Sequence, residues 1–473
     1  MKTCLLPPAA RRRCVDVVAW WGVALLWWGS GPLPASAGTA PARVTVEVEE
    51  TVYRFEPANN GAGPMWCAGS TCVVRVGDVV YASGLETVPG WKPLNNCRWV
   101  LWRRDAQGWA RWYEDEQGRT REPSPLVRVG SDILLSANPT TLPPEREGGG
   151  PARPEIRRWI EGGGAVPERV APRWQGEPRF TEHSYRSFAA DPRSGTTLLL
   201  QNIDYGHAEW SFTDPRRGAT GAGQLRWPWG DTYAKPQPVR LCYPTVALRG
   251  REAHFFGVSD ITEPNPAFRE FKRQLTGREW DYDFRRLFYA VTPDITRQPF
   301  SPWIEIASRE ETCGWLWPCD LALVRRGETW LLWTERALDE RLRERFFPEA
   351  RQWHGLVLAR MRDGKVISRT ALRQRAEGAE GPLVNAARFH QGPDRRWHVL
   401  LCSSEGGKIR NELVELDREG KEVRTLPVPF DTPFTSFFTA TPRAGNQASE
   451  YVDVLGLPQG DGQVIRYARL RLR

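Results

Sequence analysis

A repeating unit constrains the fold of this chain more than any other feature of its sequence. In each unit, two apolar, β-rich runs flank a tight polar turn, as in Cys72-Val-Val-Arg-Val, Gly77-Asp78 and Val79-Val-Tyr-Ala-Ser. The pattern returns around Gly130-Ser131-Asp132. Runs of this kind that meet at Gly and Asp residues are typical of β-hairpins. Further turns of the same type lie at 191–195, 249–251, 325–328, 393–396 and, in a weaker copy, 443–446.

A second kind of hairpin lies between these turns. It is clearest around Asp105 to Gly108, Asp363-Gly364 and Asp417 to Gly420. Two hairpins per repeat make a four-stranded antiparallel meander, and the repeats are 51 to 76 residues apart, which is the size of a propeller blade. The sequence therefore predicts an all-β fold, a seven-bladed β-propeller that forms a single domain over residues 38–473. Because the last copy is weak, six and eight blades are the alternatives.

The two ends of the predicted propeller complement each other. The last repeat ends with a strand pattern at 463–472 and lacks an outer strand, whereas residues 43–53 alternate in polarity and belong to no repeat. Pairing these segments would close the ring and cover two exposed sheet edges. We therefore expect the N-terminal strand to complete the last blade. Helical periodicity is present only around 338–346.

The first 37 residues resemble an export signal. Lys2 and Arg11 to Arg13 precede an apolar run from Val17 to Trp28, and Ala35-Ser36-Ala37 follows it. A run of this length before small residues is typical of a cleaved signal peptide, with a membrane anchor as the alternative. No other long apolar segment is present, so we expect a periplasmic or extracellular protein that does not span the membrane.

The charged residues argue against a nucleic-acid partner. The chain has 65 Lys and Arg against 57 Asp and Glu, and the two signs are interspersed without a basic tract. The cysteines do not form a zinc motif, because neither Cys67-x4-Cys72 nor Cys313-x5-Cys319 has a neighbouring His. The sequence predicts neither a metal site nor a cofactor.

Some of the cysteines lie in segments predicted to be loops. Export permits disulfides, and we expect one between Cys313 and Cys319. Cys97 with Cys67 or Cys72 is a further possible pair. Cys242 and Cys402 lie inside apolar strand patterns and are expected to stay reduced.

The repeats resemble the sialidase-like propellers, also called the BNR or Asp-box superfamily. Thr181-Glu-His-Ser-Tyr-Arg-Ser-Phe, Cys242-Tyr-Pro-Thr-Val and Trp280-Asp-Tyr-Asp-Phe-Arg-Arg-Leu-Phe are similar to a group of exported bacterial proteins without an assigned activity. The closest match to an Asp-box, Ser211-Phe-Thr-Asp-Pro-Arg-Arg-Gly, has too long a spacing. The resemblance implies a carbohydrate ligand, because the superfamily includes sialidases, other glycoside hydrolases, polysaccharide lyases and non-catalytic binders.

The long connections of a four-stranded meander indicate where a site would lie. The first and third turns of each repeat are tight, whereas the second turns and the links between repeats are long and gather at one end of the ring. We call this end the long-loop face, and we expect binding and catalytic groups there. The long segments are 58–71, 138–155, 258–285, 310–320 and 335–353.

Polar and aromatic residues fall on this face by position. The predicted catalytic residues belong to the third repeat and are His183, Arg186, Tyr205 and His207. The predicted carbohydrate-binding residues are Trp66, Tyr185, Tyr243, Arg285, Arg286, Trp315, Trp317 and Arg336. A His or Tyr beside an Arg suits proton abstraction next to a uronate carboxylate, and two opposed carboxylates suit glycoside hydrolysis. The sequence leaves three possibilities, an acidic polysaccharide lyase, a glycoside hydrolase, or a propeller that binds glycan or protein without catalysis.

Overall fold

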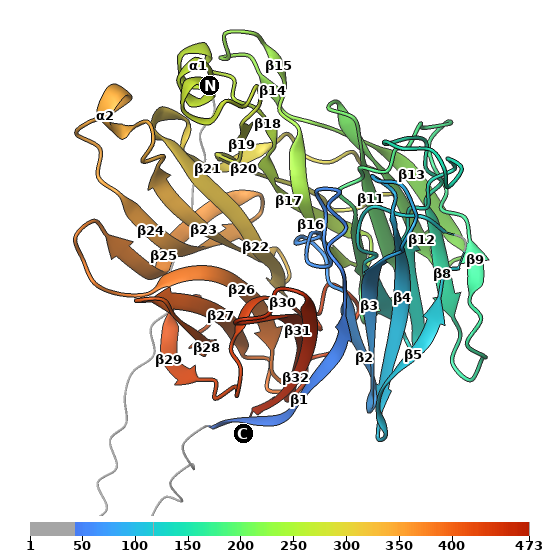
Figure 1. Ribbon diagram of the computed structural model, residues 1–473. Helices are drawn as coiled ribbons and strands as arrows, with labels where there is room; N and C mark the ends of the chain where they lie inside the picture. The colour runs from blue at the N-terminus through green and yellow to red at the C-terminus, as the bar shows by residue number, and fades with distance from the viewer. Residues whose placement is uncertain (1–42, 117, 473) are drawn as a thin grey trace, which may run out of the picture. The chain divides into compact units, whose positions relative to one another are not determined.

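The computed structural model describes residues 43–116 and 118–472, which form a seven-bladed β-propeller (Figure 1). Each blade is a four-stranded antiparallel sheet, as the sequence predicted. No helix in the described ranges is long and apolar enough to cross a membrane. Residues 1–42 lie outside the described part, so the signal peptide at 1–37 stays a prediction.

The first four blades follow the order of the chain. Blade 1 consists of β2 (Val73–Val76), β3 (Val79–Thr87), β4 (Cys97–Asp105) and β5 (Gly108–Glu114). Blade 2 consists of β6 (Leu126–Val129), β7 (Asp132–Ala137), β8 (Glu155–Trp159) and β9 (Glu168–Val170). Blade 3 consists of β10 (Ser187–Ala190), β11 (Thr197–Ile203), β12 (His207–Asp214) and β13 (Ala219–Arg226). Blade 4 consists of β16 (Leu241–Arg249), β17 (Glu252–Ser259), β20 (Arg286–Thr292) and β21 (Ile304–Ser308).

The remaining blades complete the ring. Blade 5 consists of β22 (Cys313–Arg325), β23 (Glu328–Leu338), β24 (Trp353–Arg362) and β25 (Lys365–Ala376). Blade 6 consists of β26 (Leu383–Gln391), β27 (Trp397–Glu405), β28 (Lys408–Leu416) and β29 (Glu422–Pro427). Blade 7 consists of β30 (Phe434–Thr439), β31 (Tyr451–Pro458), β32 (Val464–Leu472) and β1 (Val44–Arg54).

The repeat found in the sequence is the turn between the first and second strand of each blade. Gly77 and Gly130 occupy this turn in blades 1 and 2 with φ of 57° and 61°, a left-handed conformation that glycine adopts without a steric cost. The predicted closure is also confirmed. β1 pairs antiparallel with β32 from Val44 opposite Leu472 to Arg54 opposite Val464, so the N-terminal strand is the outermost strand of blade 7.

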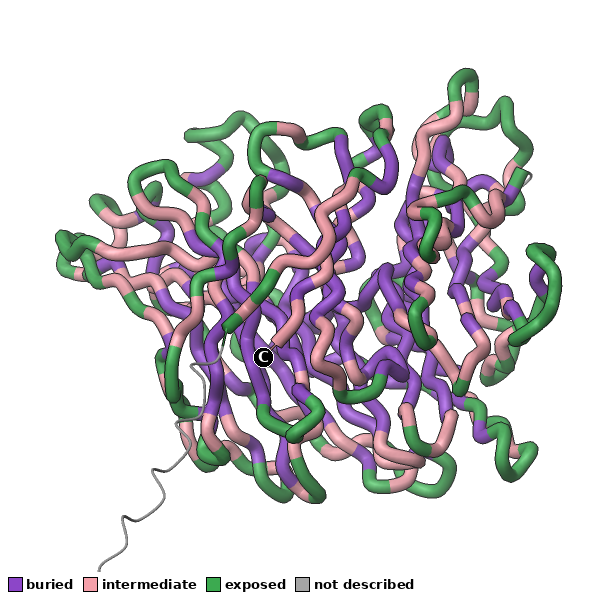
Figure 2. The backbone as a smooth tube through the Cα atoms, turned by 90° about the horizontal axis from the view of Figure 1, so that it is seen from below, coloured by how far each residue is buried: buried purple, intermediate pink, exposed green. Residues whose placement is uncertain are grey.

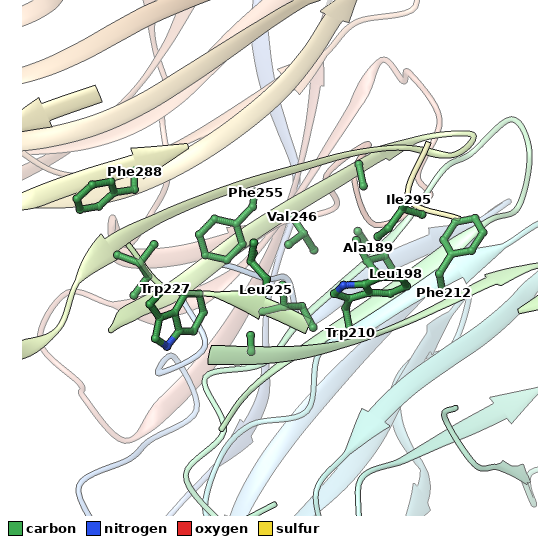
Figure 3. Packing of buried hydrophobic residues seen from close by; sticks show 14 of the residues in the cluster. Ala189, Leu198, Trp210, Phe212, Leu225, Trp227, Val246, Phe255, Phe288 and Ile295 are labelled. Carbon is green, nitrogen blue, oxygen red and sulfur yellow. The ribbon is translucent and has the colours of Figure 1, made fainter. Parts of the chain in front are cut away.

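Apolar side chains between neighbouring blades form the core. Figure 2 shows the buried residues in the interior of the molecule and the exposed residues mainly at its periphery. Between blades 3 and 4, Trp210 and Phe212 of β12 lie on the same face of their strand, because side chains alternate with a period of two. They belong to one cluster with Phe255 of β17 and Phe288 of β20 (Figure 3).

The long connections on the long-loop face contain several short helices and strands. The link from blade 3 to blade 4 contains β14 (Trp229–Gly230) and β15 (Gln237–Pro238), and η1 (Glu310–Thr312) precedes blade 5. The connection between β17 and β20 contains β18 (Ile261–Thr262), α1 (Pro266–Thr276) and β19 (Tyr282–Asp283).

The predicted helix is shorter than expected, and a longer helix was missed. β23 runs to Leu338, so only α2 (Arg343–Phe346) falls in the predicted range. The missed helix α1 has strong end signals. Asn265 accepts hydrogen bonds from the amides of Ala267 and Phe268, and Gly277 ends the helix with φ of 68°.

Candidate functional site

Residues 66–71, which we call the plug, cross the axis of the propeller. Arg388 of β26 donates to Ala68 O at 2.7 Å, and Arg443, between β30 and β31, donates to Gly69 O at 2.9 Å. Thr71 donates to Thr439 O of β30 at 2.7 Å. A Cβ atom on Gly69 would lie 2.2 Å from Pro244 O of β16. Because blades 4, 6 and 7 all approach this segment with their innermost strands, the plug occupies the axial channel.

Aromatic side chains form a continuous cluster beside the plug. Trp66 stacks on Tyr185 with ring centroids 4.8 Å apart, and Tyr185 meets Tyr243 edge-on at 5.1 Å. Tyr243 then contacts Trp317 at 4.4 Å. Tyr185 and Tyr243 have φ of 40° and 49°, a left-handed conformation that is uncommon for large side chains. The cluster unites residues that the sequence had assigned to ligand binding.

An open cavity of about 670 Å³ lies at one end of this cluster. Blades 4, 5 and 6 all contribute to its wall. Its lining residues are Tyr243, Phe284, Trp315, Trp317, Thr334, Glu335, Arg336, His354, Gly355, Leu356, Arg373, Gln374, Pro382, Leu383, Val384 and Asn385.

The face of blade 5 that lines the cavity is built from two cross-strand rows. The first row places Arg336 opposite Trp315 on one side and His354 on the other. The neighbouring row contains Trp317, Thr334, Leu356 and Arg373. Residues two apart on a strand point to the same face, and opposite residues on paired strands are neighbours.

The character of this face changes along the strands. Leu332, Leu356 and Leu358 belong to the apolar cluster that blade 5 shares with blade 6. Toward the long-loop face the same side of β23 and β24 carries Thr334, Arg336 and His354, and there the cavity lies between the blades.

Arg336 is a cation without a counter-ion. Its side chain makes no hydrogen bond or ion pair with another described residue, and its buried Nε atom has no partner. The guanidinium lies 6.0 Å from the centre of the Trp315 ring, and Trp315 stacks on Trp317 at 5.8 Å. In contrast, Arg373 pairs with Glu422 at 2.5 Å. Arg336 is therefore ready to pair with an anionic ligand.

The other titratable groups of the cavity differ in their availability. Glu335 accepts a hydrogen bond from Trp333 Nε1 at 2.6 Å and pairs with Arg309, so its carboxylate is occupied. The imidazole of His354 has no hydrogen-bond partner among the described residues. Burial, together with the charges of Arg375 and Arg336, lowers the pKa of His354 below its ordinary value. His354 is thus neutral near pH 7 and free to accept a proton.

The predicted catalytic residues of blade 3 do not line this cavity. His183 lies 3.3 Å from Glu122 and contacts Trp66, and His207 lies 3.0 Å from Glu209. Tyr205 is exposed and packs against the guanidinium of Arg240. Of the predicted carbohydrate-binding residues, Tyr243, Trp315, Trp317 and Arg336 line the cavity. A catalytic role for His183, Tyr205 or His207 stays a prediction.

Three of the predicted arginines are placed differently from the expectation. Arg186 is 1% exposed and donates to Pro123 O at 2.7 Å, and burial lowers its pKa. Arg285 is buried in ion pairs with Glu263 at 2.9 Å and Asp283 at 3.0 Å. These two side chains lie in the interior and cannot contact a ligand on the surface.

The third, Arg286, is directed to other partners. It pairs with Glu305 at 2.8 Å and donates to the hydroxyl of Tyr233 at 3.0 Å. It does not line the cavity.

The predicted disulfide is absent, and all seven described cysteines are free and buried. The expectation rested on a loop, but Cys313 and Cys319 both lie in the extended strand β22. Six residues of strand span ~20 Å, whereas a disulfide requires Cα atoms within about 7 Å. Cys242 and Cys402 are free, as predicted.

Phe284, His354 and Arg373 are cavity residues that the sequence reasoning missed. His354 could have been found from its position, because it follows Trp353 at the start of a clear strand pattern. Nothing local distinguishes Arg373 from the other arginines of β25. Among the described residues, no three His, Cys, Asp or Glu side chains are arranged to hold a metal ion.

The fold defines the chain as a seven-bladed β-propeller. No protein-family model and no curated protein matches the sequence. Among solved structures, the polysaccharide lyase Uly1 is similar with a TM-score of 0.45 and 10% identity, over 90% of this chain and 93% of that one. The alpha-L-arabinofuranosidase Arb93A of Fusarium graminearum has a TM-score of 0.41 and 11% identity over 85% and 98%.

A third similar structure is the Penicillium chrysogenum alpha-L-arabinanase complexed with arabinobiose. Its TM-score is 0.40 and its identity 11%, over 90% of this chain and 98% of that one. Similarity at this level assigns no activity to this chain.

Proposed function

We propose that the cavity between blades 4, 5 and 6 binds carbohydrate, and that its preferred ligand is an acidic sugar such as a uronate. The observation that carries the proposal is the unpaired guanidinium of Arg336 beside the stacked rings of Trp315 and Trp317. An aromatic ring can cover the C–H face of a sugar, and a guanidinium can bind a carboxylate through two parallel hydrogen bonds. The cavity offers both groups on one sheet face.

The same residues support a second candidate function, cleavage by β-elimination. Arg336 would neutralise the uronate carboxylate, and the neutral imidazole of His354 would take the proton on the carbon next to that carboxylate. The C–O bond to the next sugar would break as the ring double bond forms. Tyr243, whose pKa is raised above its ordinary value by burial, stays protonated and could protonate the leaving oxygen.

The export of the chain and its membership of the sialidase-like superfamily remain parts of this proposal. The apolar run before Gly38 supports export, and the quoted motifs support the relationship. A non-catalytic propeller that binds glycan or protein is the alternative to catalysis, and the occupied axis of the ring favours this alternative.

The test is titration calorimetry with acidic glycans (oligogalacturonate, alginate, hyaluronan) and neutral glycans (arabinan, xylan). We expect binding of at least one acidic glycan and weak or no binding of the neutral ones. Arg336→Gln should weaken acidic-glycan binding by about tenfold or more, because a hydrogen-bonded ion pair is lost. Arg326→Gln is the matched control, since Arg326 is exposed in the tight turn at the opposite end of blade 5. Equal affinity of Arg336→Gln and wild type would contradict the proposal.

Catalysis is tested in the same samples by the absorbance of unsaturated products. Turnover that His354→Gln abolishes while binding persists would support β-elimination. Binding without product, at any pH between 5 and 9, would leave the protein a glycan binder.

A further inference from the structure

Four aromatic side chains of the described residues are exposed, and all four lie on one part of the long-loop face. Tyr205, Trp229, Trp280 and Tyr282 are 51%, 58%, 61% and 37% exposed. The other exposed large apolar side chains among the described residues are aliphatic: Ile160, Val166, Val170, Leu275, Ile367 and Val423. We call the four aromatic residues the platform.

The platform residues come from connections of blades 3 and 4 only. Tyr205 lies in the turn between β11 and β12, and Trp229 begins β14. Trp280 and Tyr282 lie in the connection between β17 and β20. Figure 1 shows β14, β15, β18 and β19 together at the same end of the ring, next to α1. Separate loops thus bring exposed rings to one region.

A buried cation holds part of the platform in place. The guanidinium of Arg240 lies 4.0 Å from the ring centre of Tyr205 and 5.9 Å from that of Tyr282. Asp260 fixes Arg240 through an ion pair of 2.6 Å. Ordered rings lose little conformational entropy when a ligand covers them. The rings of Tyr205 and Tyr282 are therefore suited to binding.

Ring contacts continue from the platform to the cavity. Arg240 also lies 5.6 Å from the ring centre of Tyr185, and Tyr185 contacts Tyr243. Tyr243 lines the cavity and contacts Trp317. Tyr205 and Tyr282 of the platform are thus connected to the cavity through Arg240 and a network of packed aromatic groups.

We infer that the ligand is a glycan chain of several sugar units, with one unit in the cavity and further units on the platform. This inference rests on the proposed function, because the cavity must bind a sugar for the chain to extend from it. Each sugar has an apolar C–H face that can cover an exposed ring, and its hydroxyl groups stay in water. A protein partner is the competing occupant, but the ring contacts that lead into a sugar-sized cavity favour a continuous glycan.

The experiment compares galacturonate oligomers of two and eight units by titration calorimetry. Wild type should bind the octamer at least about tenfold more tightly than the dimer, since each ring contact contributes a factor of about two to ten. Trp229→Ala/Trp280→Ala should bind the dimer as wild type does and lose most of the gain for the octamer. Leu275→Ala is the control, because Leu275 is 52% exposed on α1 but aliphatic, and it should keep that gain.

The outcomes separate this inference from the proposed function. Arg336→Gln should weaken binding of both oligomers, which reports on the cavity. If the dimer binds but the octamer gains nothing in wild type, or if the double variant keeps the gain, the inference is overturned while the proposed function stands. Circular dichroism confirms that the variant is folded. If a panel of uronate dimers and octamers shows no binding, the proposed function fails, and the inference fails with it.

Discussion

The arginines at the axis and the arginine in the cavity have the same chemistry but different surroundings. Arg388 and Arg443 are buried and donate to main-chain carbonyls of the plug, and Arg443 also pairs with Asp320 at 2.7 Å. Arg336 is half-buried and has no polar partner among the described residues. Buried charges are retained when the protein itself satisfies them. The comparison assigns the arginines at the axis a structural role, and it supports the proposal that the cavity takes the ligand.

The largest expected effect follows from breaking the ion pair at the axis. Arg443→Met leaves the carboxylate of Asp320, which is fully buried, without its charged partner. Removing one partner of a buried pair costs about 3–5 kcal/mol of stability. Urea denaturation should show this loss as a lower midpoint.

The control is Arg410→Met, which removes an exposed ion pair with Glu405. Exposed pairs contribute about 0–1 kcal/mol. If the two variants lose similar stability, Arg443 does not have the structural role that we assign to it.

A smaller loss is expected from crowding the plug. Gly69→Ala places a Cβ atom 2.2 Å from Pro244 O, and neither main-chain segment can move without disturbing the axis. Overpacking of this kind costs about 1–3 kcal/mol. Gly63→Ala in the same link has open space around its Cβ and should unfold at nearly the wild-type temperature. Equal melting temperatures of the two variants would mean that the plug is loosely held.

The blades and their closure could be predicted because their signals are local. Alternating polarity and Gly-Asp turns define each hairpin within about a dozen residues, and the unpaired patterns at 43–53 and 463–472 had only each other to pair with. The β22 segment was misassigned for the same reason. The sequence placed residues 310–320 in a long link between repeats, but pairing with β23 makes residues 313–320 part of a strand.

The candidate site was only partly predictable, because availability of a side chain depends on distant residues. Arg285 and Arg336 look alike in the sequence, yet Arg285 meets Glu263 and Asp283 from the same long connection, whereas no described acid reaches Arg336. Tyr243, Trp315 and Trp317, which the sequence placed on the long-loop face, line the cavity together, and Trp66 lies beside it in the aromatic cluster. The contacts between these residues could not be predicted from the sequence, because they depend on how neighbouring blades pack.

The smallest expected effect is a pH dependence that sharpens the contrast between His354 in the cavity and His207 in blade 3. In the free protein, burial and then the charges of Arg375 and Arg336 lower the pKa of His354 below 6.5. A bound carboxylate would compensate those positive charges and raise this pKa. The complex would then take up a proton, so affinity should rise as the pH falls from 7 toward 5, by at most about tenfold per pH unit.

Calorimetry of an acidic oligosaccharide between pH 5 and 8 measures this dependence. His354→Gln should bind with an affinity that is nearly constant over the range, because no proton is taken up at that position. His207→Gln should retain the rise, since His207 pairs with Glu209 and does not line the cavity. If His207→Gln removes the rise and His354→Gln keeps it, the titrating group near the ligand is in blade 3. The residue assignment from the sequence would then be right, and the cavity between blades 4, 5 and 6 would not be the binding site.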